Sequence, residues 1–287
     1  MRLCELIPYC RIAPSRLLTP FSPTIFGLTA QVMTFAFAIP LYCGFHLANA
    51  VTAKKPTAAS FRISRPVLNF IPFTLLVGYG LPSALMMEAP VGADMRQKFI
   101  AAWHPWPAYV TIMVTIVDLL FSPRRKADPG RATLSALRRV YAFAFATAAL
   151  PHVLSLVVSI ASIRTPFLFS EEYRAALHPA EVFKTALPWT KPALQVGSVA
   201  EGVHVFLRWD YLIGTFGVLL WAMSLHTTAN WVVLRKSGWF GMLVKTVLLV
   251  VVSGPVGAAV ELMWERDELV IQEAMLAKRQ VQGNKKK

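Results

Sequence analysis

The amino-acid sequence predicts an all-α protein, a polytopic membrane helix bundle of six transmembrane helices, or seven if one crossing escapes the count. Of the 287 residues, 55% are hydrophobic and only 15% are charged, whereas soluble domains carry about 25% charged residues. The apolar residues gather in stretches of about twenty or more, long enough to cross a bilayer. Short basic segments separate these stretches, which is typical of topology signals.

The strong positive charge of the chain does not indicate a nucleic-acid partner. The formal net charge is +14, and a basic surface can attract nucleic acid. Here the Lys and Arg residues occupy the connections between apolar stretches, where they set membrane orientation. We therefore expect the lipid bilayer as a partner, and no nucleic acid.

The sequence divides into a basic N-terminal segment (residues 1–20), a transmembrane bundle (residues 21–263) and a charged C-terminal tail (residues 264–287). The first segment lacks the continuous apolar core of a cleavable signal peptide, so we expect the first span to act as the insertion signal. Cys4, Cys10 and Cys43 form no CxxC motif, so neither a disulfide framework nor a metal site is predicted.

The first half of the bundle is predicted to hold three spans. The first covers residues 21–51 with a kink at Pro40. The second covers residues 67–87 and contains several Pro and Gly residues, whose freed backbone groups need partners from neighbouring helices. The third covers residues 99–121 and opens with Trp-His-Pro-Trp, a pattern typical of the aromatic belt at a membrane interface.

The second half is predicted to hold three more spans. The fourth covers residues 140–163, and the long connection after it includes residues 170–185, which have the pattern of a short amphipathic helix on the membrane surface. The fifth covers residues 201–230. The sixth covers residues 239–263 and contains Lys245 and a Gly-Pro pair.

The charge distribution predicts which loops of this multi-pass chain face the cytoplasm. We expect the membrane to be that of the endoplasmic reticulum. With six spans, the first, third and fifth loops share one side and hold twelve Lys and Arg residues against one acid. The positive-inside rule makes that side cytoplasmic. The six Lys and Arg residues of the tail argue for the opposite orientation, a conflict that a seventh crossing would remove.

The fifth span carries an acid inside an apolar stretch. After Asp210, twenty residues run to Asn230 without an Asp, Glu, Lys or Arg. At about 100° per residue, Asp210 shares one helix face with Gly214, Gly217 and Trp221. One interpretation of this face is a packing stripe against another helix. The other is a buried acid that opens onto a pocket, because a carboxylate facing lipid is expensive.

Alternation of the spans places most of the acids near one membrane face. The ionisable residues at that face are Glu88, Asp94, His104, Glu201, His204, Asp210 and Glu261. The sequence has no P-loop, no GxGxxG, no HExxH and no Asp-rich segment, so we expect no cofactor and no metal.

An acid in aromatic, apolar surroundings favours one chemistry above others. Burial disfavours the charged form of a carboxyl group, so a buried acid can stay protonated and act as a general acid. Aromatic faces stabilise cations by about 0.5–2 kcal/mol each. These features suit protonation of an epoxide or alkene followed by carbocation cyclisation. They also suit a proton-coupled transporter, in which acids relay protons.

The chain plan and the stretch FLRWDYLIGTFGVLLWA around Asp210 resemble the fungal integral-membrane terpene cyclases of meroterpenoid pathways, of the ascochlorin and ascofuranone cyclase type. The resemblance implies a metal-free cyclase that acts on a farnesyl group attached to an aromatic or polyketide part. It implies a lipophilic prenylated substrate, with other membrane enzymes of the pathway as partners.

The resemblance assigns roles to particular residues. Asp210 would protonate the substrate, while Glu88 and Glu261 would hydrogen-bond it or relay protons. The final proton would go to His104 or His204. The aromatic lining of the pocket would comprise Trp103, Trp106, Trp209, Tyr211 and Trp221.

Each role has a structural alternative. The Trp residues can belong to the interfacial belt or to helix packing, and the two His residues can be interfacial. Arg208 can pair with Asp210 or with Glu201, and a pair with Asp210 would weaken the proposed chemistry. Lys245 either snorkels or neutralises an acid in the bundle. A transporter and a scaffold for partner enzymes stay open as functions.

Overall fold

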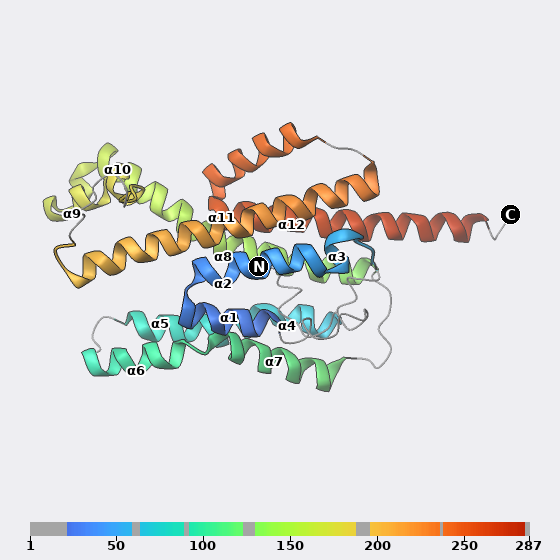
Figure 1. Cartoon of the computed structure of the whole chain (residues 1–287), viewed down its shortest axis with the longest axis horizontal. Coiled ribbons are helices and arrows are strands. Elements are labelled where there is room, and N and C mark those ends of the chain that lie inside the picture. The colour runs from blue at the N-terminus through green and yellow to red at the C-terminus, as the bar shows by residue number, and fades with distance from the viewer. Residues whose placement is uncertain are drawn as a thin grey trace.

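The computed structural model describes residues 22–58, 64–88, 92–122, 130–187, 196–235 and 238–284. These residues form helices and connections, and no strand occurs among them. The N-terminal segment 1–20, with Cys4 and Cys10, lies outside the described residues. The long helices run roughly side by side (Figure 1), which confirms the predicted all-α bundle.

Four helices are long and apolar enough to cross a membrane. They are residues 65–87 (α4 Arg65–Leu75, η2 Leu76–Gly80 and α5 Leu81–Met87), α8 (Arg131–Arg164), α11 (Val199–Leu234) and α12 (Trp239–Asn284). A fifth candidate consists of α6 (Ala93–Trp103) and α7 (Trp106–Phe121), which are bent by 48° at their junction. The membrane character of the chain is confirmed, whereas the count of six or seven spans is not.

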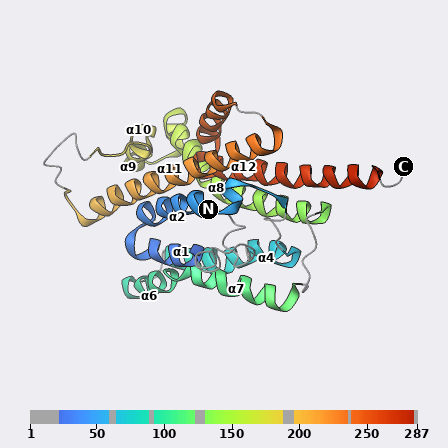
Figure 2. The same cartoon turned by 45° about the vertical axis from the view of Figure 1, so that its right-hand side comes forward.

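The first predicted span is wrong as a single crossing. It forms two helices, α1 (Ser22–Met33) and α2 (Phe35–Asn49), which fold back on each other around Thr34 (Figures 1 and 2). Thr34 has a φ of 97°, and its hydroxyl caps α2 by accepting the N–H of Phe37 at 3.3 Å. At about 1.5 Å per residue, neither helix spans the roughly 30 Å of hydrocarbon. Pro40 lies inside α2 without ending it.

The second predicted span is one helical run with a π-helical segment. Pro72 lies inside α4, and the π segment follows directly. Gly78 lies in that segment, and a Cβ there would approach Val110 and Met113 of α7 to 2.9 Å. The absence of a side chain lets the two helices pack closely where the helix is irregular.

The expected surface helix at residues 170–185 occurs as two shorter helices, α9 (Glu171–Leu177) and α10 (Pro179–Val182). They follow a short 3-10 turn, η3 (Pro166–Leu168), after α8. The hydroxyls of Ser159 and Ser162 both donate to the carbonyl of Leu177, which ties α9 to the end of α8.

The last helix reverses direction at the Gly-Pro pair. Gly254 has a φ of 74°, a left-handed conformation that favours glycine. The leg before it (residues 239–253) and the leg after it (residues 255–284) therefore run in opposite directions (Figure 1). The predicted sixth span (residues 239–263) is therefore interrupted at Gly254, although by length and composition the whole of α12 is a candidate membrane span.

The helix continues unbroken through the predicted start of the tail at residue 264. Arg266 and Asp267 are both 0% exposed, and Val270 and Ile271 belong to the buried core. The first turns of the expected charged tail are thus part of the bundle. The buried charges are tolerated because Arg266 and Asp267 pair with each other.

Basic helix ends gather at one end of the bundle. The starts of α4 and α8, the end of α11 and the short helix α3 (Val51–Lys54) lie at the right in Figures 1 and 2. The C-terminal end of α12 lies at the same end because of the reversal at Gly254. The described basic ends of these helices and the end of α12 therefore lie at one end of the bundle, an arrangement that the positive-inside rule favours.

Candidate active site

Asp210 caps the N-terminus of another helix. Its Oδ1 accepts the backbone N–H of Ala36 at 2.6 Å. Ala36 lies in the first turn of α2, where backbone N–H groups have no acceptor within their own helix. The half-buried carboxyl group thus faces the positive end of the α2 dipole, a place that favours negative charge.

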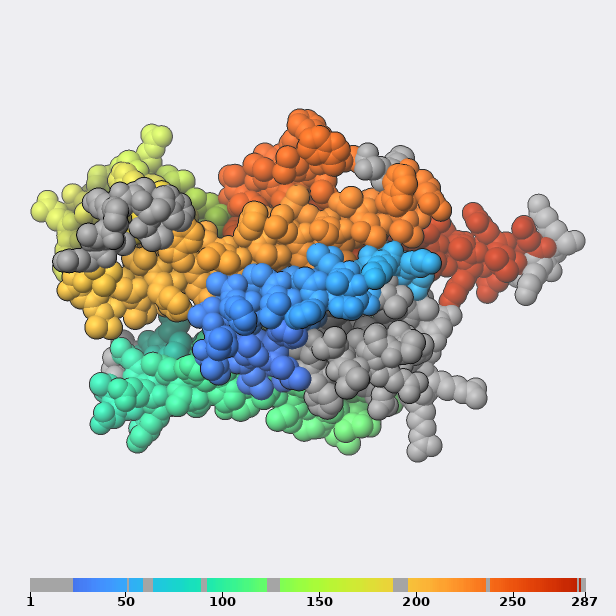
Figure 3. Space-filling model, in the orientation of Figure 1, coloured from blue at the N-terminus to red at the C-terminus, as the bar shows by residue number. Residues whose placement is uncertain are grey.

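The helix face that Asp210 shares with two glycines is covered by α2. A Cβ at Gly214 would lie 2.0 Å from the Phe35 ring, and one at Gly217 would lie 2.8 Å from Pro40. In the space-filling view, α2 lies directly against α11 (Figure 3). The predicted face is therefore real, and around the glycines it is a packing stripe.

Trp221 ends this stripe inside the core. Its side chain is 1% exposed, and its indole N–H donates to His46 Nδ1 at 3.0 Å. The two rings meet edge to face with centroids 5.5 Å apart. The other ring nitrogen of His46, Nε2, lies 3.3 Å from the Thr52 hydroxyl. Trp221 therefore joins α11 to α2.

Arg208 and Trp209 of α11 bind backbone carbonyls of residues 181–186, in and directly after α10. The guanidinium of Arg208 donates to the carbonyls of Lys184 and, at 2.9 Å, of Glu181. The indole N–H of Trp209 donates to the carbonyl of Ala186 at 2.8 Å. The alternative in which Arg208 pairs with Asp210 is wrong, because the guanidinium donates to these carbonyls instead.

Trp103, His104 and Trp106 form one aromatic cluster with Tyr79 at the bend between α6 and α7. The Tyr79 ring lies 5.0 Å from that of Trp106 and 6.2 Å from that of Trp103, measured between centroids. The Trp103 indole donates to the Ser83 hydroxyl at 2.9 Å, and the Trp103 and His104 rings lie 5.7 Å apart. Three predicted site residues, Trp103, His104 and Trp106, thus meet here.

The other predicted residues form no polar contact with Asp210 among the described residues. Glu88 follows α5 and is exposed, and Arg96 donates to its backbone carbonyl at 3.3 Å. His204 and Tyr211 are exposed on α11. Glu261 is half-buried on the second leg of α12. Within the described ranges, no hydrogen bond or ion pair joins Asp210 to any of these four residues.

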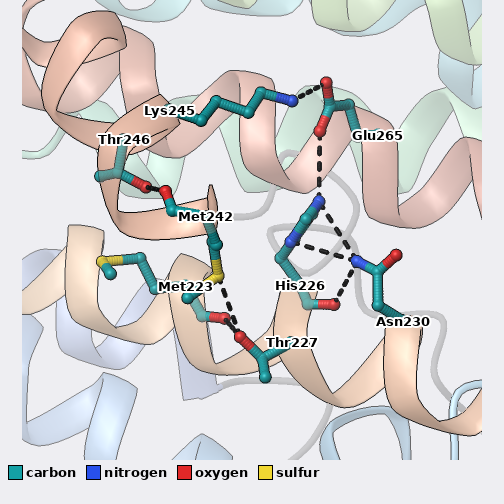
Figure 4. Close-up of polar contacts among 8 residues, drawn as sticks. All are labelled: Met223, His226, Thr227, Asn230, Met242, Lys245, Thr246 and Glu265. Atoms are coloured by element: carbon teal, nitrogen blue, oxygen red, sulfur yellow. Dashed lines mark hydrogen bonds and ion pairs between the residues drawn. The ribbon is translucent and has the colours of Figure 1, made fainter. Parts of the chain in front are cut away.

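A polar cluster that the sequence analysis did not assemble joins α11 to both legs of α12 (Figure 4). Lys245 donates to Glu265 Oε1, and His226 Nε2 lies 3.1 Å from Glu265 Oε2. The side-chain amide of Asn230 donates to the His226 carbonyl at 3.0 Å. Of the two alternatives for Lys245, neutralisation of an acid in the bundle is confirmed.

This cluster was missed for a specific reason. The sequence analysis assigns Glu265 to the charged tail (residues 264–287), beyond the predicted bundle that contains His226 and Lys245. The reversal at Gly254 brings Glu265 back along Lys245 and His226. The Gly-Pro pair was the available signal, because such a pair often marks a turn.

A second polar network lies wholly inside the bundle. Arg266 Nη1 and Asp267 Oδ1 are 2.8 Å apart, and both side chains are fully buried. The Tyr141 hydroxyl donates to Asp267 Oδ2 at 2.6 Å, and Arg266 also donates to the Thr52 carbonyl. This network fastens α12 to α8 and to the short helix α3. Over the described part of the chain, no three His, Cys, Asp or Glu residues form a metal-binding group.

Comparison with known proteins shows similarity to one group of fungal enzymes. The model of the CtvD domain matches residues 15–271. The terpene cyclase ctvD of Aspergillus terreus is 30% identical over 256 residues, which is 86% of this chain and 68% of that protein. The terpene cyclase penA of Penicillium crustosum is 33% identical over 68% of this chain and 52% of its own length.

A third relative is the terpene cyclase ascI of Acremonium egyptiacum, 28% identical over 87% of this chain and 63% of its own length. This chain thus spans between about half and two thirds of the length of these relatives. No solved structure matches it.

Proposed function

Because this chain belongs to the CtvD family of fungal terpene cyclases, we propose that it cyclises the farnesyl-type chain of a meroterpenoid precursor by protonation. Asp210 is the proton donor in this proposal, and the reaction uses no metal. The observation that supports it is the position of the Asp210 carboxyl group at the N-terminus of α2.

This position gives the acid a defined orientation. A protonated carboxyl group donates through one oxygen and accepts through the other. Oδ1 accepts the N–H of Ala36, so in the proposed mechanism Oδ2 carries the proton that is transferred. When Oδ2 gives up its proton, the new negative charge lies beside a backbone N–H and the positive end of a helix. Such fixed dipoles stabilise charge that develops in a transition state.

The proposed reaction consumes and releases no net proton. Asp210 transfers a proton to the epoxide oxygen, or to the terminal alkene carbon, and becomes a carboxylate. The C–O bond or the π bond opens to a carbocation, which internal alkenes attack in turn. A final C–H bond gives its proton to a base, for which His104 and His204 are the proposed candidates, and a neutral cyclised product remains. Return of that proton to Asp210 closes the cycle.

The aromatic residues take the lining role in the same proposal. Trp103 and Trp106 with Tyr79 form a cluster of ring faces, and a cation over an aromatic face is stabilised by about 0.5–2 kcal/mol. Trp209 and Tyr211 flank Asp210 in sequence. Glu88 and Glu261 are proposed as relays that exchange protons with water. The endoplasmic reticulum is the proposed membrane, and membrane enzymes of the same pathway are proposed partners.

The test uses membranes that contain the full chain and an epoxyfarnesyl-aromatic substrate. We expect cyclised product with and without EDTA, and no product from Asp210→Asn. The Asn side chain still offers an oxygen to Ala36 but has no acidic proton. Glu171→Gln removes an exposed acid on α9 and should keep full activity. Loss of product in EDTA, or activity in Asp210→Asn, would contradict the proposal.

Proton-coupled transport is the second candidate function. The cluster of Lys245, Glu265 and His226 places titratable groups where α11 meets the two legs of α12, and proton pathways are built from such groups. Substrate-dependent proton uptake by reconstituted vesicles, abolished in Glu265→Gln, would support it. A scaffold for partner enzymes would instead lose complex formation on substitution of Glu88 or Asp210 and would show no turnover.

A further inference from the structure

A groove separates the start of α8 from the last turns of α12, at the basic end of the bundle. Its volume is about 430 Å³, within the range of small-molecule sites. The residues that line it are Arg131, Leu134, Ser135, Arg138, Gln272, Met275, Leu276 and Arg279. Three guanidinium groups and no carboxylate belong to this lining.

Each helix contributes one continuous face to the groove. On α8 the lining residues recur at intervals of three or four from Arg131 to Arg138, and on α12 they recur in the same way from Gln272 to Arg279. The helices are antiparallel here, and Arg138 contacts Glu268. Arg131 precedes Arg138 by seven residues, so in an antiparallel pair it lies level with about residue 275, seven residues after Glu268. Arg279 is one helical turn beyond that level. Both arginines thus stand at the outer mouth.

The inner part of the groove is already ordered. The carboxylate of Glu268 accepts hydrogen bonds from Nε of Arg138 at 3.1 Å and from its Nη2. It also accepts one from the side-chain amide of Gln272 at 2.6 Å. The indole N–H of Trp264 donates to the same carboxylate at 3.2 Å. These contacts fix Arg138 and Gln272 in place, so the wall needs little reorganisation when a ligand enters.

The outer part of the groove carries two arginines that no described acid neutralises. Among the residues that the structure describes, neither Arg131 nor Arg279 forms a salt bridge. Glu273, the other acid on this part of α12, does not line the groove. Two guanidinium groups at one mouth repel each other, and an anion between them would relieve that repulsion.

A helix terminus adds a second attraction for an anion. α8 is 34 residues long, its N-cap Gly130 provides no side-chain acceptor, and no acid lies in its first turn. Uncapped N–H groups at the positive end of a long helix bind phosphate and similar anions. Arg131 begins this helix, so the helix end and the arginine serve the same mouth of the groove.

We propose that this groove binds a phosphate group, carried by an anionic lipid whose acyl part lies along Leu134, Met275 and Leu276. Arginine recognises phosphate through paired N–H donors, which supports the head-group position. The apolar floor supports a lipid over free inorganic phosphate. The basic end of the bundle is the side where the positive-inside rule places the anionic leaflet.

Native mass spectrometry of the full chain in neutral detergent tests this proposal. Phosphatidic acid, phosphatidylcholine and inorganic phosphate are added separately. We expect one retained phosphatidic acid and weaker retention of phosphatidylcholine. In Arg131→Gln/Arg279→Gln the affinity for phosphatidic acid should fall about 30-fold, since each basic residue near an anionic surface contributes about fivefold. High salt should weaken binding in the parent chain.

The control Lys54→Gln/Lys55→Gln removes the same charge at the same end, away from the groove, and should bind normally. If inorganic phosphate competes with phosphatidic acid at equal concentration, the phosphate site stands and its natural ligand is soluble. Equal retention of phosphatidic acid by the parent and by the arginine double variant would overturn the proposal. So would equal losses in the arginine and lysine double variants.

Discussion

The ring nitrogen Nε2 of His152 lies 3.1 Å from the carbonyl oxygen of Val251. Val251 is in the last turn before Gly254, where carbonyls lack donors from their own helix. Pro255 follows and has no N–H to offer. His152 on α8 therefore supplies a hydrogen bond at the point where α12 reverses, and it holds the turn against the bundle.

Replacing His152 by Phe should destabilise the reversal. Phe keeps a ring beside Gly254, where a Cβ would lie 3.0 Å from His152 Cγ, but it cannot donate to Val251. A carbonyl left without a donor in apolar surroundings costs about 1–3 kcal/mol. Thermal unfolding in detergent checks this. An unchanged unfolding temperature would show that the contact with Val251 is dispensable.

Gly214→Ala should separate α11 from α2. The new Cβ would lie 2.0 Å from the ring of Phe35, a distance that forces backbone movement, and overpacking of this kind costs about 1–3 kcal/mol or more. Both the unfolding temperature and cyclase turnover should fall, because the same displacement moves Ala36 away from Asp210. Gly44→Ala is the matched control, since nothing lies within 4 Å of its Cβ position. A second change, Phe35→Ala, should restore part of the loss.

The ion pair between Lys245 and Glu265 should contribute modestly to stability. The two side chains are 40% and 35% exposed, so solvent in water, or headgroups at a membrane edge, would screen them. We expect a coupling energy of about 1 kcal/mol in a double-mutant cycle with Lys245→Met and Glu265→Gln. The exposed pair of Lys184 and Glu181 should give a smaller coupling. Equal couplings for the two pairs would contradict this assignment.

Asp267→Asn should be the most destabilising of these changes. It leaves the fully buried guanidinium of Arg266 without its counter-charge. Breaking a buried ion pair in this way lowers the free energy of unfolding by about 3–5 kcal/mol. Tyr141→Phe removes only the hydroxyl that donates to Asp267, and it should cost about 1 kcal/mol. Folded yield and unfolding temperature measure both. A smaller loss for Asp267→Asn than for Tyr141→Phe would be inconsistent with a buried ion pair.

Helical periodicity was enough to predict the face of Asp210, Gly214, Gly217 and Trp221. That face depends only on spacing within one long helix, and the structure has it on α11. What covers the face could not be predicted, because α2 comes from a distant part of the chain. The structure shows its approach in the contacts of the two glycines, the Ala36 hydrogen bond and the hydrogen bond from Trp221 to His46.

The two reversals, at Thr34 and at Gly254, explain most of the differences from the predicted span plan. Thr34 lies between two equally apolar segments, and threonine with a positive φ is uncommon, so composition gave no warning. Gly254 precedes a proline, which is a recognisable turn signal, but the apolar residues on both sides favoured a continuous span. Each reversal therefore escaped a prediction based on hydropathy.

The buried charges of the last helix escaped prediction for a different reason. Arg266 and Asp267 are adjacent in a charged sequence, which is typical of a solvated helix. Their burial depends on each other and on Tyr141 from α8. Pair formation across helices cannot be derived from one segment. The roles of Glu88, Glu261, His104 and His204 stay predictions.

The most direct measurement compares Asp210→Asn and Asp210→Ala for both unfolding temperature and single-turnover cyclisation. Asn retains an acceptor for the N–H of Ala36, so its unfolding temperature should match the parent while product formation is lost. Ala should lower the unfolding temperature by removing the cap, which is worth about 0.5–2 kcal/mol, and should also be inactive. Product formation by a fully folded Asp210→Asn variant would contradict the assignment of Asp210 as the proton donor.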